Sequence, residues 1–138
     1  MANTGHDWGA WANIDADQPV TLTTAGTITD TSDAVDLDIK SACEVSIDAD
    51  YSDHAKATGG LSVYVARDIN GTDYEVVADG AWGFEMPFTQ AGTHRRAFAV
   101  DPGQIGKFKI ITVWANTTGS SNVAYTIKVR TASVPLAS

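Results

Sequence analysis

The sequence predicts an all-β protein: an antiparallel β-sandwich of immunoglobulin-like or jelly-roll type, with eight or nine strands and an irregular N-terminal arm. Three observations predict this class. Valine, isoleucine and threonine supply 37 of the 138 residues against only four leucines, and side chains branched at Cβ favour pleated strands over helices. Apolar and polar residues alternate in one segment after another from residue 19 onward. Turns rich in Gly, Asn and Asp separate these segments at intervals of roughly 8–14 residues.

The alternating segments place the strands along the chain. The first 18 residues show neither helical nor strand periodicity and are predicted to form an arm, followed by the sandwich domain at 19–132 and a short C-terminal tail at 133–138. Strands are predicted at 20–24, 35–39, 43–48, 61–65, 74–78, 82–88, 94–100, 108–115 and 123–130, with a short piece at Ile28. The segment 108–115 is almost continuously apolar, which is typical of a central strand covered on both faces.

Two segments carry stronger local signals. Asn70-Gly71 predicts a tight hairpin that returns through 74–78, because both residues tolerate a positive φ. The segment 82–88 places four large apolar side chains on one face at strict alternation: Trp82, Phe84, Met86 and Phe88. This face is predicted to lie in the core. The alternative is a carbohydrate-stacking platform, to which Tyr64 and Tyr74 beside the hairpin would contribute.

The charge is acidic and unevenly distributed. Nine basic and 17 acidic residues give a net charge of −8 and a pI near 4.5, which disfavours nucleic acid and anionic membranes as partners. Residues 1–53 hold 11 of the acids and one base, Lys40. Four of these acids alternate with predicted core positions: Asp36, Asp38, Glu44 and Asp48. They are therefore expected to form one acidic sheet surface that faces solvent or a partner.

The single cysteine and the chain ends bear on the compartment. Cys43 cannot form an internal disulfide, and it alternates with Val45 and Ile47 as a buried small apolar residue would. The N-terminus shows no secretory signal and no apolar stretch is long enough to span a membrane. Synthesis and folding in a cytoplasm are therefore expected.

Candidate catalytic and metal-binding groups are sparse. His6, His54 and His94 lie in different segments, and none has a second His or a Cys at ligand spacing. No nucleophile elbow or phosphate-binding loop is present. The protein is therefore expected not to be an enzyme and to need no cofactor.

One acidic loop resembles a calcium loop in part. Asp48, Asp50 and Asp53 offer oxygen ligands at nearly alternate positions, but position six lacks the glycine and position twelve lacks the glutamate of an EF-hand. A solvated acidic strand end is the competing interpretation, and no metal is expected.

The arm contains the candidate partner-binding residues. Trp8 and Trp11 lie in an irregular segment with Gly5 and Gly9, where periodicity does not imply a core position. They either pack back on the arm's own domain or anchor the arm on a partner, where tryptophan is a favoured buried residue. The predicted partner-binding set is Trp8, Trp11, Asn13 and Ile14.

Three segments resemble small virion structural proteins of tailed bacteriophages. They are LSVYVARDINGTDYEVV, RRAFAVDPGQIGKFKIITVWANTTG and VAYTIKVRT. The shared sequence pattern is a strand ending in Asp, a short Asn/Gly turn, T-D-Y at the start of the return strand, and F-A-V-D-P before an apolar strand. The resemblance covers roughly residues 30–131 and is closest to capsid decoration, or cement, proteins.

The resemblance implies a non-enzymatic β-rich domain that binds the outside of an assembled head and bridges its capsomers. The implied partners are the major capsid protein and neighbouring copies of this chain, as a homo-oligomer such as a trimer. The implied location is the virion, with synthesis in the host cytoplasm and assembly on the capsid exterior. The alternatives are a tail, neck or baseplate structural protein, and a carbohydrate-binding β-sandwich module for host-surface glycans.

Overall fold

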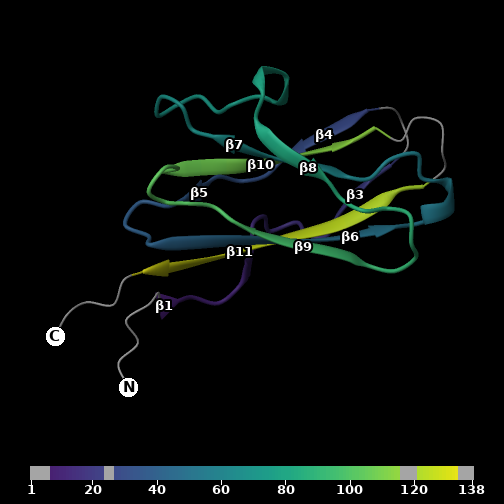
Figure 1. Ribbon diagram of the computed structural model, residues 1–138, viewed down its shortest axis with the longest axis horizontal. Coiled ribbons are helices and arrows are strands. Elements are labelled where there is room, and N and C mark those ends of the chain that lie inside the picture. Colours follow the sequence, from purple (N-terminus) through teal and green to yellow (C-terminus); the bar gives the residue numbers. More distant parts are fainter. Residues whose placement is uncertain (1–6, 24–26, 116–120, 134–138) are drawn as a thin grey trace.

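The predicted β-sandwich is confirmed by a computed structural model that describes residues 7–23, 27–115 and 121–133 (Figure 1). Sheet A contains β1 (Asp7–Trp8), β2 (Ala12–Asn13), β3 (Val20–Leu22), β6 (Ala42–Tyr51), β9 (His94–Ala99) and β11 (Val123–Ser133). Sheet B contains β4 (Ile28–Thr31), β5 (Val35–Asp36), β7 (Ser62–Arg67), β8 (Trp82–Glu85) and β10 (Lys107–Trp114). The described helical turns are two 3₁₀ turns, η1 (His54–Lys56) and η2 (Val77–Asp79). No described helix is long and apolar enough to cross a membrane.

The strand order is that of a jelly roll. Sheet A runs β11–β6–β9, with β1, β2 and β3 in turn along the outer edge of β11; sheet B runs β10–β7–β8, with β4 and β5 along the outer edge of β10. Every pair is antiparallel. The described strands therefore occupy eight positions, four in each layer, and the chain crosses repeatedly between layers as in a double Greek key. Of the two predicted topologies, the jelly roll is the one observed.

The core lies between the two sheets and follows the predicted alternation. In β6 the buried positions are Cys43, Val45, Ile47, Ala49 and Tyr51, and the intervening residues face outward. Trp114 of β10 is fully buried and stacks on Tyr51 with 5.6 Å between ring centroids. Burial raises the pKa of the Cys43 thiol to about 11, which leaves it protonated and unreactive at neutral pH.

A buried polar contact joins the two sheets beside the N-terminal segment. The Tyr125 hydroxyl of β11 donates to Asp30 Oδ2 of β4 at 2.7 Å and lies 2.8 Å from the Thr112 hydroxyl of β10. Burial raises the pKa of Tyr125 far above its usual value, so the phenol stays protonated and remains a donor.

The predicted arm contains sheet structure in its described part. β1 and β2 pair with β11, at Trp8↔Ala132 and Asn13↔Lys128. Between β2 and β3 the chain leaves the strand, and the Gln18 side chain accepts the Ile127 N–H at 2.7 Å in place of a backbone carbonyl. Residues 7–22 thus form an interrupted edge strand, which covers backbone groups that an exposed edge would leave unpaired.

Two strand predictions are wrong. Strand 35–39 ends at Asp36: Leu37 is buried, but Ile39 is 88% exposed with φ 58° in a turn where Lys40 N–H donates to the Leu37 carbonyl. Segment 74–78 makes a single bridge, Asp68↔Tyr74. Its local turn is wider than a two-residue hairpin, because the side chains of Asp68 and Asn70 accept the backbone N–H groups that a hairpin ladder would use.

Ile39→Gly is expected to stabilise the protein. The left-handed backbone at φ 58° destabilises a residue with a side chain by about 1–2 kcal/mol, and glycine removes this strain. Glycine also loses more conformational entropy on folding, which offsets roughly half of the gain. The expected gain in the free energy of unfolding is about 0.5–1 kcal/mol by urea denaturation. Ile69→Gly is the control, since Ile69 is also exposed but has no positive φ, and it should lose stability. Equal losses in both variants would contradict the assignment of strain to Ile39.

Candidate functional site

The two arm tryptophans gather around one arginine on the outer face of sheet A. The Arg130 guanidinium carbon lies 4.2 Å from the Trp8 ring centroid and 4.9 Å from that of Trp11. Arg130 Nη2 also donates to Glu44 Oε1 at 2.6 Å, across the β6–β11 pair. A guanidinium held by a carboxylate is a rigid platform for aromatic rings. The tryptophans are thereby fixed in place, and Trp11 still exposes 39% of its surface.

The other two predicted partner-binding residues differ in exposure. Asn13 is exposed in β2, opposite Lys128. Ile14 packs against the core, and its N–H donates to the Ile127 carbonyl at 3.0 Å. Of the four predicted residues, Trp8, Trp11 and Asn13 therefore lie near one another at the surface, and Ile14 anchors the segment beneath them.

A shallow groove continues from Trp11 across sheet A. It is lined by Ser46 and Asp48 of β6, Arg95 and Ala97 of β9, and Lys128 of β11. Arg95 and Asp48 form an ion pair at 3.4 Å. We call this outer surface of sheet A the arm face; it comprises Trp8, Trp11, Glu44, Asp48, Arg95, Lys128 and Arg130.

The prediction that the acids form a single sheet surface is wrong. Asp36 lies in β5 of sheet B, whereas Glu44 and Asp48 lie in β6 of sheet A, where basic residues of β11 and β9 pair with them. Sequence halves do not map to faces here, because the N-terminal half of the chain contributes strands to both sheets. Asp15, between β2 and β3, has other acidic neighbours. Its burial is the largest cause that raises its pKa, and the negative charges of nearby aspartates, first of all Asp33, raise it further.

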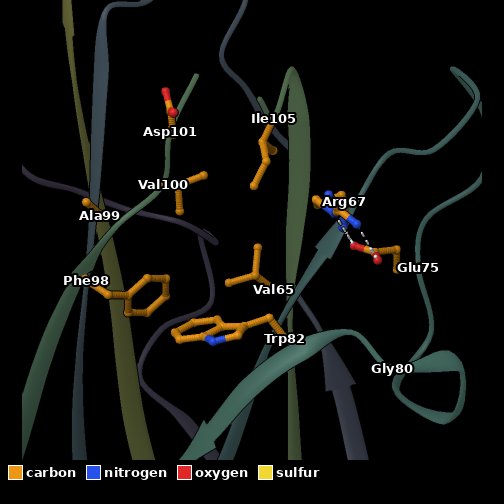
Figure 2. A pocket seen from close by; sticks show the side chains of 10 residues that line it. All are labelled: Val65, Arg67, Glu75, Gly80, Trp82, Phe98, Ala99, Val100, Asp101 and Ile105. Atoms are coloured by element: carbon orange, nitrogen blue, oxygen red, sulfur yellow. Dashed lines mark hydrogen bonds and ion pairs between the residues drawn. The ribbon is translucent and has the colours of Figure 1, made fainter. Parts of the chain in front are cut away.

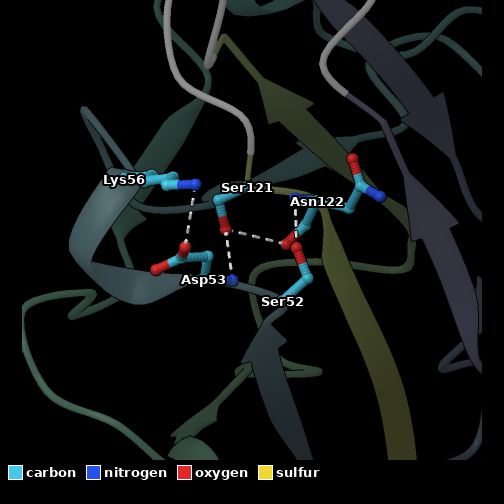
Figure 3. Close-up of polar contacts among 5 residues, drawn as sticks. All are labelled: Ser52, Asp53, Lys56, Ser121 and Asn122. Carbon is cyan, nitrogen blue, oxygen red and sulfur yellow. Dashed lines mark hydrogen bonds and ion pairs between the residues drawn. The ribbon is translucent and has the colours of Figure 1, made fainter.

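The calcium candidates do not converge. Asp48 and Asp50 point outward from β6, and Asp48 pairs with Arg95. Asp53 follows the strand, where its carboxylate pairs with Lys56 at 3.6 Å and its N–H donates to the Ser121 hydroxyl at 3.1 Å (Figure 3). Within the described ranges, no group of three or more His, Cys, Asp or Glu residues is arranged to hold a metal ion. The contacts in Figure 3 instead join the end of β6 to the start of β11.

The two described histidines lie in different elements, His54 in η1 and His94 in β9. His94 packs against Tyr51 with 5.8 Å between ring centroids, and its Nε2 lies 2.8 Å from the Gln90 carbonyl. His6 falls outside the described residues.

The β8–β9 side of the sandwich is closed by aromatic rings. Trp82 and Phe84 of β8 and Phe98 of β9 make three mutual ring contacts with centroids 5.5–5.7 Å apart. The Arg96 guanidinium carbon lies 4.0 Å from the Phe84 ring centroid. Of the predicted core face, Met86 is fully buried and Phe84 and Phe88 are partly buried, but Trp82 is 55% exposed. Trp82 lies on the inward face at the start of β8, which is the edge strand of sheet B, and none of the described strands pairs with its outer side.

Trp82 and Phe98 lie at one end of a pocket of about 400 Å³, which we call the edge pocket (Figure 2). The apolar wall is formed by Val65, Val100 and Ile105. Arg67, Glu75 and Asp101 supply its charged groups. Tyr64 and Tyr74 are not part of it: Tyr64 lies against Gly83, where any Cβ would collide with its ring, and the Lys109 ammonium lies over Tyr74 at 4.7 Å.

The charged wall of the edge pocket is a two-point ion pair. Arg67 Nε and Nη2 donate to the two carboxylate oxygens of Glu75 at 2.7 and 3.0 Å. The side-chain hydrogen bond from Arg67 lowers the pKa of Glu75, and the same contact raises the pKa of Arg67. The pair therefore persists at neutral pH and is lost only as the pH falls through the lowered pKa of Glu75.

Residue patterns missed two parts of these sites. Arg130 is an ordinary outward position of an alternating strand, and only the pairing of β1 with β11 brings Trp8 to it. Alternation predicts which face of the strand Trp82 lies on, but it does not predict that the strand is at the edge of a sheet. The edge pocket therefore could not be predicted from it. The aromatic alternation of 82–88 was the only signal for it.

Comparison with known proteins gives no family. No protein-family model matches the chain, and no curated protein does. Among solved structures, a family 16 carbohydrate-binding module is similar at TM-score 0.45 and 11% identity, over 79% of this chain and 73% of that one. The coat protein of Tobacco streak virus matches at TM-score 0.38 and 13% identity, over 100% and 92%. Desmodium yellow mottle tymovirus matches at TM-score 0.34 and 8% identity, over 100% and 94%. At such low scores these likenesses carry no argument about function.

Arg130→Ala is expected to loosen the N-terminal edge strand. The variant removes both ring contacts and the charge-assisted bond to Glu44, a loss of about 1–2 kcal/mol. The amide protons of Gly9 and Ile14, which donate to carbonyls of β11, should exchange about tenfold faster by NMR-detected hydrogen exchange. Lys128→Ala, on the same face of β11, should leave their exchange unchanged. Equal exchange in the two variants would show that Arg130 does not hold the segment.

Proposed function

We propose that this chain is a non-enzymatic virion structural protein that binds the exterior of a phage capsid through the arm face and stabilises the shell there. The resemblance of residues 30–131 to decoration proteins supports the class. The observation that carries the proposal is the cluster of Trp8, Trp11 and Arg130 on an exposed sheet surface. The jelly-roll fold is compatible, since viral capsid and lectin domains both use it, but a fold does not establish a function.

The composition of the arm face suits a protein interface. Tryptophan and arginine are the residues that most often dominate binding energy at interface centres. Here they are already ordered by contacts within the chain, so little further side-chain entropy is lost on binding. The acids Glu44 and Asp48 each have a basic partner. A partner can therefore cover this face without leaving these two carboxylates unpaired.

The proposed partners are the major capsid protein and neighbouring copies of this chain, arranged as a homo-oligomer such as a trimer. Binding to the assembled shell but not to its dissociated subunits would shift the assembly equilibrium toward the shell. The proposed location is the virion, after synthesis in the host cytoplasm. Because residues 7–22 form an edge of sheet A, deleting the segment would disturb folding as well as binding. Point substitutions are therefore the sharper test.

Trp11→Ala is expected to weaken binding to heads of the source phage that lack this protein by at least tenfold, measured by co-sedimentation. The side chain is partly exposed, so the variant should fold with an unchanged circular dichroism spectrum. Trp82→Ala is the matched control, because Trp82 is an exposed tryptophan on the β8–β9 side. It should bind heads like the unaltered protein.

Two outcomes would overturn the proposal. Binding that is unchanged in Trp11→Ala but weakened in Trp82→Ala would move the contact away from the arm face. Binding to tails, necks or baseplates and not to heads would favour the alternative structural role.

A further inference from the structure

We infer that the edge pocket is a binding site for a neutral saccharide, which stacks one pyranose ring on Trp82 and hydrogen-bonds its hydroxyls to Arg67 and Asp101. This site lies away from the arm face and goes beyond the proposed capsid contact. Its volume of about 400 Å³ falls in the range of small-molecule sites, which combine an apolar lining with a few fixed polar groups.

The aromatic end of the pocket is ordered without a ligand. Trp82 contacts Phe84 and Phe98 at tilted angles of 57° and 59°, and its strand position is fixed by pairing with Val65. Figure 2 shows the indole extended beside Phe98, below Val65 and Val100. An indole that is 55% exposed yet held by neighbours presents an apolar surface that binding need not immobilise. The C–H faces of a pyranose are a matching flat apolar surface.

The polar wall is likewise fixed and still has bonding capacity. The Arg67–Glu75 pair uses two of the five N–H donors that a guanidinium carries. Asp101 Oδ1 accepts the Gly103 N–H at 2.8 Å, which orients the carboxylate within its own turn. Arg67, Glu75 and Asp101 all line the pocket. Figure 2 shows the Arg67–Glu75 pair beside the apolar wall and the Asp101 carboxylate at the opposite end from Trp82. Adjacent hydroxyl groups, each both donor and acceptor, match such a mixed set.

The charges select against ionic ligands. Glu75 and Asp101 would repel a phosphate or carboxylate near Arg67, and Arg67 would repel an ammonium group near the carboxylates. The stable two-point pair between Arg67 and Glu75 would also have to break before either group could pair fully with an ion. A neutral polyhydroxyl compound meets neither penalty, so the pocket favours a neutral sugar over an anionic or cationic ligand.

The test uses the full chain on an array of immobilised neutral, sialylated and sulfated glycans. Each neutral glycan that binds is then titrated in solution by isothermal titration calorimetry, which does not depend on Trp82 as a reporter. The variants are Trp82→Ala, Trp82→Phe and Arg67→Ala, with Trp11→Ala as the matched control and a thermal melt to check folding. Neutral glycans should bind the unaltered protein and Trp11→Ala equally. Affinity should fall at least tenfold in Trp82→Ala and Arg67→Ala and by less in Trp82→Phe.

Three results would overturn the inference. One is an array with no bound neutral glycan. Another is binding confined to sialylated or sulfated glycans, which would indicate an ionic site. The third is neutral-glycan binding that Trp82→Ala leaves intact. None of these three results would contradict the proposed capsid binding, because that proposal depends on Trp11 and uses Trp82→Ala as its control.

Discussion

The structure depends on the pairing of β11 along both of its edges. On one side β11 pairs with β6 over ten consecutive residue pairs, from Val123↔Tyr51 to Ala132↔Ala42. On the other side it holds β1, β2 and β3 in succession. A strand that is paired on both edges holds the strands on its two sides in register with each other. In this sheet it also fixes the N-terminal segment, which has no periodicity of its own and would otherwise lack a defined place.

Both candidate sites follow from how the two sides of this jelly roll are closed. On the β11 side, the N-terminal segment supplies the missing edge, and its tryptophans come to rest on Arg130. On the opposite side, β8 and β9 are edge strands of different sheets, and aromatic side chains with Arg96 fill the gap between them. The first closure produces a flat face with paired charges, and the second leaves a pocket. A flat ordered face suits a large protein partner, and a pocket suits a small ligand.

The fold class was predictable from sequence because alternation reports which face of a strand is buried, as the burial of Val45 and Ile47 confirms. Alternation does not report which strands become neighbours. For that reason the acidic surface was predicted wrongly, the pairing of Trp8 with β11 was missed, and Trp82 was placed in the core. Ile39 fits the apolar alternation of Val35 and Leu37, yet the chain turns at Asp38 and exposes it. The hydrogen bond from the Asp38 N–H to the Asp36 side chain favours the turn over the strand pattern there.

The central claim is that the N-terminal edge strand presents the partner contact on the arm face. A cryo-EM reconstruction, at side-chain resolution, of the phage head proposed to carry this chain tests it most directly. The account predicts density for this chain on the capsid exterior, with Trp11 and the outer face of sheet A buried against the shell and the edge pocket open to solvent. Heads without this density, or a chain attached through sheet B or the β8–β9 side, would contradict it.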